Sequence, residues 1–204
     1  YSATDMDHFS PESHEQSKVP GLSEIGGNVV LLIGNFHANK GHLVLLEAFE
    51  QFGEKHPKTH LVFVGHNTDR GLLAERIAQS RFSTRIHGLG FRQDIPGLLQ
   101  AARVVVNASF EEGFAGAIRE GLAMGVAVVA SDIPANREVA DTVPLRFFSA
   151  GQSRELAKAL ADELAIEDNS ELKKKRREAA FQEFSVPVMV QRTLNAYKEF
   201  GLPK

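Results

Sequence analysis

Six short apolar runs alternate with helical patterns along most of the chain, and this alternation limits the possible folds more than any other feature. The runs are 28–34, 60–65, 84–90, 103–109, 126–131 and 145–150. Several are almost unbroken series of Val, Ile, Leu and Phe, which is typical of strands buried on both faces. The pattern predicts an α/β fold: a three-layer α/β/α, Rossmann-like domain with a mostly parallel six-stranded sheet.

Helical patterns fill the intervals between the apolar runs and continue after the last run. They cover 41–56, 69–80, 94–102, 114–125 and 136–140, and then about 153–165, 169–184 and 188–200. Residues 1–27 are polar and lack periodicity, so we expect a linker or extended segment that leads from a missing N-terminal domain. Residues 28–204 then form one folded domain, whose last part, 153–204, is helical.

Composition narrows the class of protein. The chain has 204 residues, no Cys and a net charge of −3, which excludes disulfides and a Cys nucleophile and makes a nucleic-acid partner unexpected. No apolar run approaches the roughly 20 residues of a membrane helix, and a cytoplasmic location is expected. The basic run 173–177 is either a solvated helix face or a contact with anionic lipid headgroups, which would make the full-length protein peripheral at the inner face of a membrane.

Ligands of open parallel sheets bind at the carboxyl ends of strands, so the residues after each run are candidates for a site. The first run leads into "GNFHANKGH", residues 34–42. Asn39 and Gly41 break the phosphate-loop pattern, and Phe36 breaks the dinucleotide-binding pattern. What remains is a glycine turn with Lys40 near a helix start, where an ammonium and exposed N–H groups suit a phosphate. The alternative is a surface lysine without a ligand.

The fourth run leads into a glycine-rich turn that lies between two carboxylates, Glu112 and Glu120. Gly113 and Gly116 allow the backbone to approach a ligand closely, and a helix is predicted to begin near Ala115. The first N–H groups of that helix can bind a diphosphate, while the two carboxylates hold opposite ends of one elongated ligand. The alternative is that Glu112 interacts only with the helix dipole and Glu120 faces solvent.

Together these segments resemble the carboxyl-terminal, donor-binding domain of a GT-B glycosyltransferase of group 1, family 4. Residues 34–49 resemble the family segment G-R-x-x-x-x-K-G…L-L-x-A-F, and residues 109–139 resemble S-x-x-E-G-F-G…E-A-x-A-x-G-x-P-V-V-x-S…E-V. Residues 4–11, 85–109 and 183–200 resemble the interdomain linker, the intervening segment and the closing helix. The resemblance therefore extends over nearly the whole chain, in order.

The resemblance implies roles for the residues at the strand ends. Glu112 and Lys40 are the catalytic candidates: Glu112 contacts the donor sugar, and Lys40 neutralises the leaving diphosphate. Glu120 holds the ribose hydroxyls of the nucleotide. The other implied substrate-binding residues are Gly34 and Asn35 beside the diphosphate, Gly90 and Phe91 at the base, and Gly113, Phe114, Ala115 and Gly116 around the helix start.

The resemblance also implies a reaction. A hexose or related sugar passes with retention of configuration from a nucleotide sugar, for which a UDP- or GDP-sugar is expected, to a glycan, lipid or small-molecule acceptor, as in polysaccharide biosynthesis. No metal and no other cofactor are implied. The acceptor binds to an N-terminal domain in this family, so we expect this chain alone to bind donor weakly and to turn over little. The alternatives are a non-catalytic nucleotide-sugar-binding or regulatory module, and a sugar-nucleotide epimerase or phosphorylase of the same fold.

Three positions depart from the family pattern. The family usually has Arg at the position of Asn35, Gly at the position of Ala115 and Trp at the position of Val186. Without the arginine a bidentate phosphate contact is lost. Ala115 adds a methyl group near the donor and disfavours a positive φ. The change at Asn35 therefore predicts weaker donor binding, an altered donor, or a fold kept without activity.

Several histidines fall at or near strand ends. They are His37, His42, His60, His66 and His87. Most are predicted to be turn or surface residues. His87 lies inside the third apolar run, where it can approach a base, but no acid or base role is assigned to it.

Overall fold

The structure is a computed structural model that describes residues 3–14, 22, 26–140, 143 and 145–199. Its strands are β1 (Asn28–Ile33), β2 (Thr59–Val64), β3 (Ile86–Gly88), β4 (Val104–Asn107), β5 (Ala127–Ser131) and β6 (Arg146–Phe148). They form one sheet in the order β3-β2-β1-β4-β5-β6, and every pairing between these strands is parallel. The predicted α/β fold with a six-stranded parallel sheet is confirmed, and each apolar run overlaps one strand.

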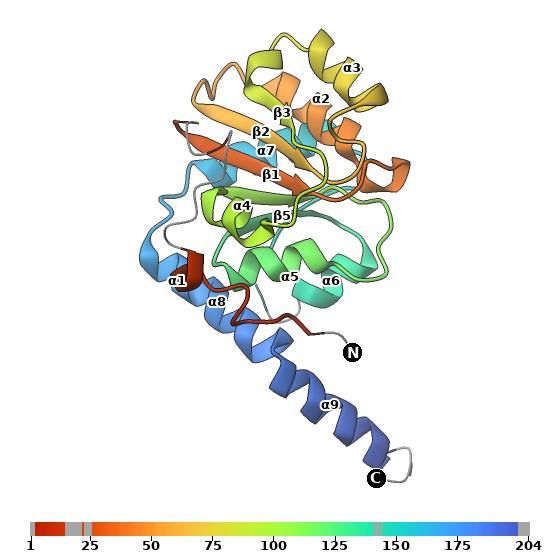
Figure 1. Cartoon of the computed structure of the whole chain (residues 1–204), viewed down its shortest axis with the longest axis vertical. Helices are drawn as coiled ribbons and strands as arrows, with labels where there is room; N and C mark the ends of the chain where they lie inside the picture. Colours follow the sequence, from red (N-terminus) through yellow and green to blue (C-terminus); the bar gives the residue numbers. More distant parts are fainter. Residues whose placement is uncertain (1–2, 15–21, 23–25, 141–142, 144, 200–204) are drawn as a thin grey trace.

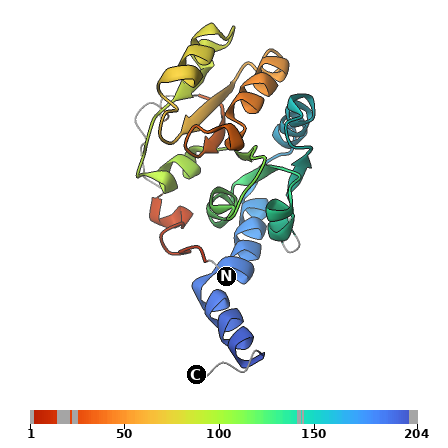
Figure 2. The ribbon, with the colours of Figure 1, turned by 90° about the vertical axis from the view of Figure 1, so that its right-hand side faces the viewer.

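Helices cover both faces of the sheet (Figure 1 and Figure 2). The apolar run that forms β1 is unbroken because both faces of the strand are buried. Val29 and Leu31 belong to one core, and Val30 and Leu32 belong to the other. One core is closed by α2 (His42–Phe52), α3 (Gly71–Gln79) and α7 (Ser153–Leu164). The other is closed by α4 (Ile95–Ala101), α5 (Gly116–Ala123), α6 (Pro134–Ala140) and α8 (Ser170–Phe184).

The strand order places the first and fourth strands side by side. From β1 the chain moves outward to β2 and β3, and then returns to β4 on the other side of β1. The direction of winding reverses there, so the carboxyl ends of β1 and β4 form the switch point at which open α/β sheets bind ligands. Both glycine-containing segments that the sequence analysis selected follow these two strands.

Residues 3–14, the longest described part of the predicted linker, lie along α8 (Figure 1). The Thr4 N–H donates to the Phe184 carbonyl at 2.8 Å, and Met6 is buried. A short helix, α1 (Pro11–His14), occurs there. Neither this helix nor its packing is predicted by the local sequence. The rest of the linker up to residue 25, apart from residue 22, lies outside the described residues.

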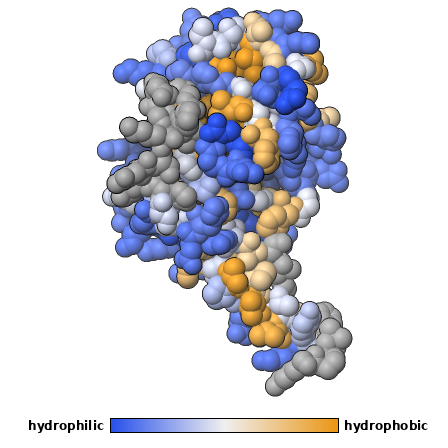
Figure 3. Space-filling model, in the orientation of Figure 1, coloured by the Kyte–Doolittle hydropathy of each residue, from blue (hydrophilic) through white to orange (hydrophobic). Residues whose placement is uncertain are grey.

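Helix α9 (Val186–Glu199) follows α8 after one residue, Ser185. It begins two residues before the predicted start, because Pro187 sits in its first turn, where a missing N–H costs no helical hydrogen bond. The helix extends away from the sheet, and apolar side chains lie along it (Figure 1 and Figure 3). The exposed ones are Val186, Val190, Leu194 and Tyr197.

The buried face of α5 is expected to contribute strongly to stability. Leu122 is fully buried against the sheet, so Leu122→Ala should lower the free energy of unfolding by about 2–5 kcal/mol. Leu72 on α3 is 49% exposed, and Leu72→Ala should cost less than about 1 kcal/mol. Urea unfolding of both variants measures the difference. Equal losses in the two variants would contradict the assignment of Leu122 to the core.

Candidate functional site

The loops that follow β1 and β4 meet at the switch point. A short 3₁₀ helix, η1 (Ala38–Lys40), follows β1, and its Asn39 carbonyl accepts a hydrogen bond from the Phe110 N–H at 2.8 Å. Gly41 then adopts a positive φ of 65° and lies so close to Ala108 that a Cβ atom would fall 2.1 Å from the Ala108 carbonyl oxygen. Only glycine fits there, so Gly41 sets the close approach of the two loops.

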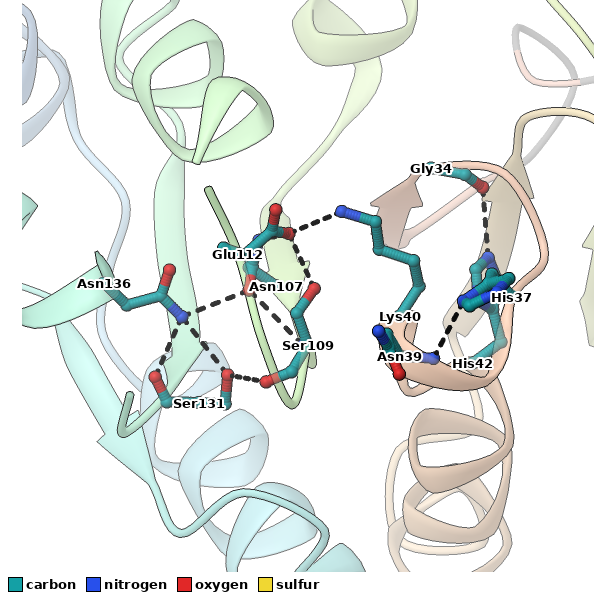
Figure 4. Close-up of polar contacts among 10 residues, drawn as sticks. All are labelled: Gly34, His37, Asn39, Lys40, His42, Asn107, Ser109, Glu112, Ser131 and Asn136. Atoms are coloured by element: carbon teal, nitrogen blue, oxygen red, sulfur yellow. Dashed lines mark hydrogen bonds and ion pairs between the residues drawn. The ribbon is translucent and has the colours of Figure 1, made fainter. Parts of the chain in front are cut away.

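This approach brings the two catalytic candidates together. Lys40 Nζ lies 2.8 Å from Glu112 Oε1, although the two residues are 72 positions apart (Figure 4). The same oxygen accepts hydrogen bonds from Ser109 Oγ at 2.7 Å and Asn107 Nδ2 at 3.2 Å. The Glu112 side chain is only 8% exposed, whereas the Lys40 side chain is 34% exposed. The carboxylate is therefore held firmly, and the ammonium stays accessible to a ligand.

An open hollow of about 580 Å³ lies beside this ion pair. Its lining residues are Asn35, His37, Asn39, Lys40, Glu111, Glu112 and Gly113. Gly34 lies just before these residues and accepts a hydrogen bond from the His42 ring. The Asn35 side chain is engaged as well, because its Oδ1 accepts from the His66 N–H at 2.9 Å. Where the family usually has an arginine, this chain has an amide that holds the neighbouring loop.

Helix α5 begins at Gly116, next to the predicted start at Ala115. Ala115 has a φ of −80°, so the alanine at this position meets no left-handed strain. No side chain caps this end of the helix, and the adjoining Gly113 has open space around its Cα. Phe114 is 42% exposed, and the Arg119 guanidinium lies 3.9 Å from the centre of its ring. The uncapped N–H groups give this helix end a positive potential.

Glu120 lies one turn inside α5 and is not among the residues that line the hollow. Its carboxylate bends back toward the helix start, with Oε1 3.9 Å from where a side chain on Gly116 would begin. Burial raises the pKa of the Glu120 carboxyl above its usual value, and the positive charge of His8 opposes this effect. The predicted convergence of Glu120 with Lys40 and Glu112 on one ligand stays a prediction.

The loops after β2 and β3 form a further part of this edge. Gly90 has a positive φ of 66°, and its N–H donates to Thr68 Oγ1 at 3.0 Å. Phe91 is 58% exposed and stacks on His66, with ring centres 4.6 Å apart and planes at 10°. Sequence analysis named Gly90 and Phe91 but missed the stack, because no local pattern shows which ring His66 will meet.

His42 is an exception to the prediction that most of the histidines near strand ends are turn or surface residues. His42 is 1% exposed at the start of α2, where its Nε2 lies 3.1 Å from the Gly34 carbonyl. A carbonyl only accepts, so Nε2 carries the proton. Nδ1 is buried and has no hydrogen-bond partner within the described residues. Burial lowers the pKa of His42 to about 4, and the hydrogen bond to the Gly34 carbonyl partly opposes this shift. His87, the histidine placed near a base, lies 3.1 Å from the His60 ring.

Within the described ranges, no group of three or more His, Asp or Glu side chains is placed to hold a metal ion. No helix in the same ranges is long and apolar enough to cross a bilayer. Each cation of the basic run has a carboxylate within 3.7 Å. The partners are Asp168 for Lys173 and Arg176, Glu178 for Lys174, Glu171 for Lys175 and Glu12 for Arg177. The three lysines are more than half exposed, whereas Arg176 and its partner Asp168 are nearly buried.

Comparisons with known proteins identify the family of the chain. The family model described as "Glycosyl transferases group 1" matches residues 27–165. Mannosylfructose-phosphate synthase of Agrobacterium fabrum is 29% identical over 113 residues, which are 50% of this chain and 25% of that protein. The chain therefore spans only about a quarter of the length of this relative.

Two solved structures share the fold. A glycosyltransferase from Rickettsia africae superposes with a TM-score of 0.81 at 24% identity, over 97% of this chain and 55% of that one. HepE of Anabaena, in complex with UDP and glucose, superposes with a TM-score of 0.80 at 23% identity, over the same shares. The chain covers about half of each, and at these identities the likeness shows the fold alone.

Stability should depend on pH through His42. The unfolded residue titrates near 6.5 and the folded one near 4, so the folded state disfavours the proton. The stability that comes from keeping His42 neutral is present above about pH 6.5 and is lost as the pH falls toward 4. Between about pH 7 and pH 4.5 the wild type should lose roughly 2–3 kcal/mol more than His42→Gln. Urea unfolding of both proteins at the two pH values measures this, and equal losses would contradict it.

Proposed function

The chain belongs to the group 1 glycosyltransferases, and from that premise we propose that it binds the nucleotide-sugar donor of a retaining glycosyltransferase. The observation that carries the proposal is the contact of Lys40 with Glu112 at the switch point, beside the uncapped start of α5. A cation, a helix amino end and a fixed carboxylate at one place suit a ligand with an anionic middle and a hydroxylated end.

Lys40 and the start of α5 act on the diphosphate in this proposal. Breaking the bond from the sugar to the diphosphate leaves negative charge on the leaving oxygen, while the sugar becomes oxocarbenium-like. An ammonium and oriented N–H groups near that oxygen stabilise the charge as it develops, which lowers the barrier. The backbone of Phe114, Ala115 and Gly116 supplies the N–H groups. Asn35 is a weaker neighbour of the phosphates than an arginine would be.

Glu112 acts on the sugar. Its Oε1 accepts from Lys40, Ser109 and Asn107, and none of the residues drawn in Figure 4 contacts its second oxygen. That oxygen is available to accept hydrogen bonds from sugar hydroxyl groups. If Lys40 turns to the diphosphate, the two neutral donors still hold the carboxylate. Glu112 therefore keeps its orientation when the donor binds.

The nucleotide occupies the rest of the edge. Glu120 binds the ribose hydroxyls, and the backbone at Gly90 and Phe91 contacts the base next to the ring of His66. A UDP- or GDP-sugar is the proposed donor. The Anabaena structure with UDP and glucose has the same fold, which supports a uridine nucleotide. No metal or further cofactor is part of the proposal.

Sugar transfer requires an acceptor. In this proposal the acceptor is a glycan, a lipid or a small molecule. The described part of this chain holds one sheet, and it covers 55% of each of the two solved structures. We therefore propose that a second domain binds the acceptor and that this chain alone turns over little. A cytoplasmic location, with peripheral contact to a membrane in the full-length protein, completes the proposal.

One observation favours a second function, a non-catalytic nucleotide-sugar-binding or regulatory module. Asn35 stands where the family usually has arginine, and its side chain is bonded to the loop at His66. A site without that guanidinium can bind a donor without stabilising the leaving group. The two functions differ in turnover by the complete protein, which only the first one predicts.

The diphosphate site is tested by removing the Lys40 ammonium. Lys40→Met should weaken UDP binding about tenfold or more, because a charge-assisted contact is lost, and should leave uridine binding unchanged. Lys55→Met is the matched control: Lys55 is exposed beyond the far end of α2 and has no part in the site. Calorimetry with UDP, GDP, ADP and uridine measures these affinities. If Lys40→Met and Lys55→Met bind UDP equally well, Lys40 does not contact the phosphates.

Restoring the family arginine tests the place of Asn35. Asn35→Arg should tighten UDP binding by roughly 1–3 kcal/mol, since a guanidinium contacts a diphosphate through two hydrogen bonds. Uridine, which has no phosphate, measures separately how the lost Asn35–His66 contact affects binding of the base. Calorimetry again provides the measurement. An unchanged affinity for UDP would place residue 35 away from the phosphates.

A further inference from the structure

A buried relay of polar side chains stands behind Glu112. Asn136, on α6, is completely buried, and its Nδ2 lies 2.9 Å from the Ser131 carbonyl and 3.1 Å from Asn107 Oδ1 (Figure 4). Asn107, at the end of β4, in turn directs its Nδ2 to Glu112 Oε1 at 3.2 Å. Two side chains that lie 29 positions apart in the sequence thus connect a main-chain carbonyl to the carboxylate of the candidate site.

The Ser131 carbonyl determines the direction of every bond in this relay. A carbonyl only accepts, so the Asn136 atom that faces it must be the NH₂ group. The same NH₂ group faces Asn107, which must therefore present its oxygen to Asn136. The NH₂ group of Asn107 is then turned toward Glu112. An amide with its two ends exchanged would direct an oxygen at the carboxylate and repel it.

We propose that Asn136 is a positioning residue that, through Asn107, holds the Glu112 carboxylate in the orientation required to bind the donor sugar. This inference rests on the proposed function of Glu112. Asn107 and Ser109 are neutral donors from the same strand end, and they keep their contacts with Oε1 when Lys40 engages a phosphate. Two donors face the Asn107 oxygen, the Asn136 NH₂ group at 3.1 Å and the Ser109 N–H at 3.4 Å. Asn136 is the nearer donor and the one that comes from another element, so the direction of the Asn107 amide depends chiefly on it.

The cost of burying Asn136 supports a role beyond packing. Its Oδ1 is buried and has no hydrogen-bond partner within the described residues. A buried polar atom without a partner destabilises the folded state, and an apolar side chain of similar size would avoid that cost. The NH₂ group of Asn136 is the part that contacts the relay.

Asn136→Asp tests the relay with almost no change in size. An NH₂ group carries two hydrogens, whereas a carboxyl oxygen carries one at most, so the substituted side chain cannot donate to both Ser131 and Asn107 in either protonation state. The Asn107 amide should reverse and the Glu112 carboxylate should leave its position. Crystal structures of the ligand-free wild type and variant show this directly. A Glu112 carboxylate in the same position in the variant as in the wild type would overturn the proposal.

Binding provides a second readout that a general structural defect would not reproduce. The probes are UDP-glucose with UDP, and GDP-mannose with GDP, and the pair that the wild type binds more tightly is used. Asn136→Asp should weaken binding of the sugar nucleotide about tenfold and change binding of the free diphosphate by less than about twofold, because Glu112 faces the sugar. Asn136→Leu, which removes both donors without adding an oxygen, should act in the same direction.

Ser153→Ala is the matched control, since Ser153 is also a buried polar residue and bonds to Gln51 outside the site. It should change neither affinity. Equal weakening of both ligands in the Asn136 variants, or no weakening of the sugar nucleotide, would overturn the positioning role. If the wild type binds none of the four probes, the proposed function fails, and the crystal structures alone decide whether Asn136 orients Glu112.

Discussion

The ion pair of Lys40 and Glu112 depends on two strand ends that the sheet order places side by side. Strand β4 pairs with β1 only because the chain reverses its direction of winding after β3. Gly41 then allows the loops after β1 and β4 to come so close that a Cβ atom at this position would clash with Ala108. Everything proposed for the site, from phosphate binding to sugar recognition, follows from this approach of two distant segments.

The two charged groups of the pair differ in how they are held. Glu112 is almost buried and has neutral donors on the same oxygen as the ammonium, whereas Lys40 reaches it from a more exposed position. An arriving diphosphate competes with the carboxylate for Lys40, and Glu112 keeps its other contacts. The helix end at Gly116 adds positive potential without a mobile side chain. The site thus combines one adjustable cation with a fixed acceptor and fixed N–H groups.

The sequence was most informative about features that depend on local pattern. Each apolar run overlapped a strand, and α5 began next to the predicted residue. Burial on both faces and a glycine turn can each be recognised from residues a few positions apart. The family resemblance selected Lys40 and Glu112 as site residues, but it did not predict their ion pair. The buried state of His42, the His66–Phe91 stack and the Asn136 relay were missed. Each depends on partners from other elements, and no spacing along the chain reveals them.

The most direct test of this account is a crystal structure of the chain with UDP-glucose. The account predicts the diphosphate within about 3 Å of Lys40 Nζ and of the first N–H groups of α5, with the glucose against the free oxygen of Glu112. A nucleotide bound elsewhere, with the Lys40–Glu112 contact intact and no phosphate near α5, would contradict it.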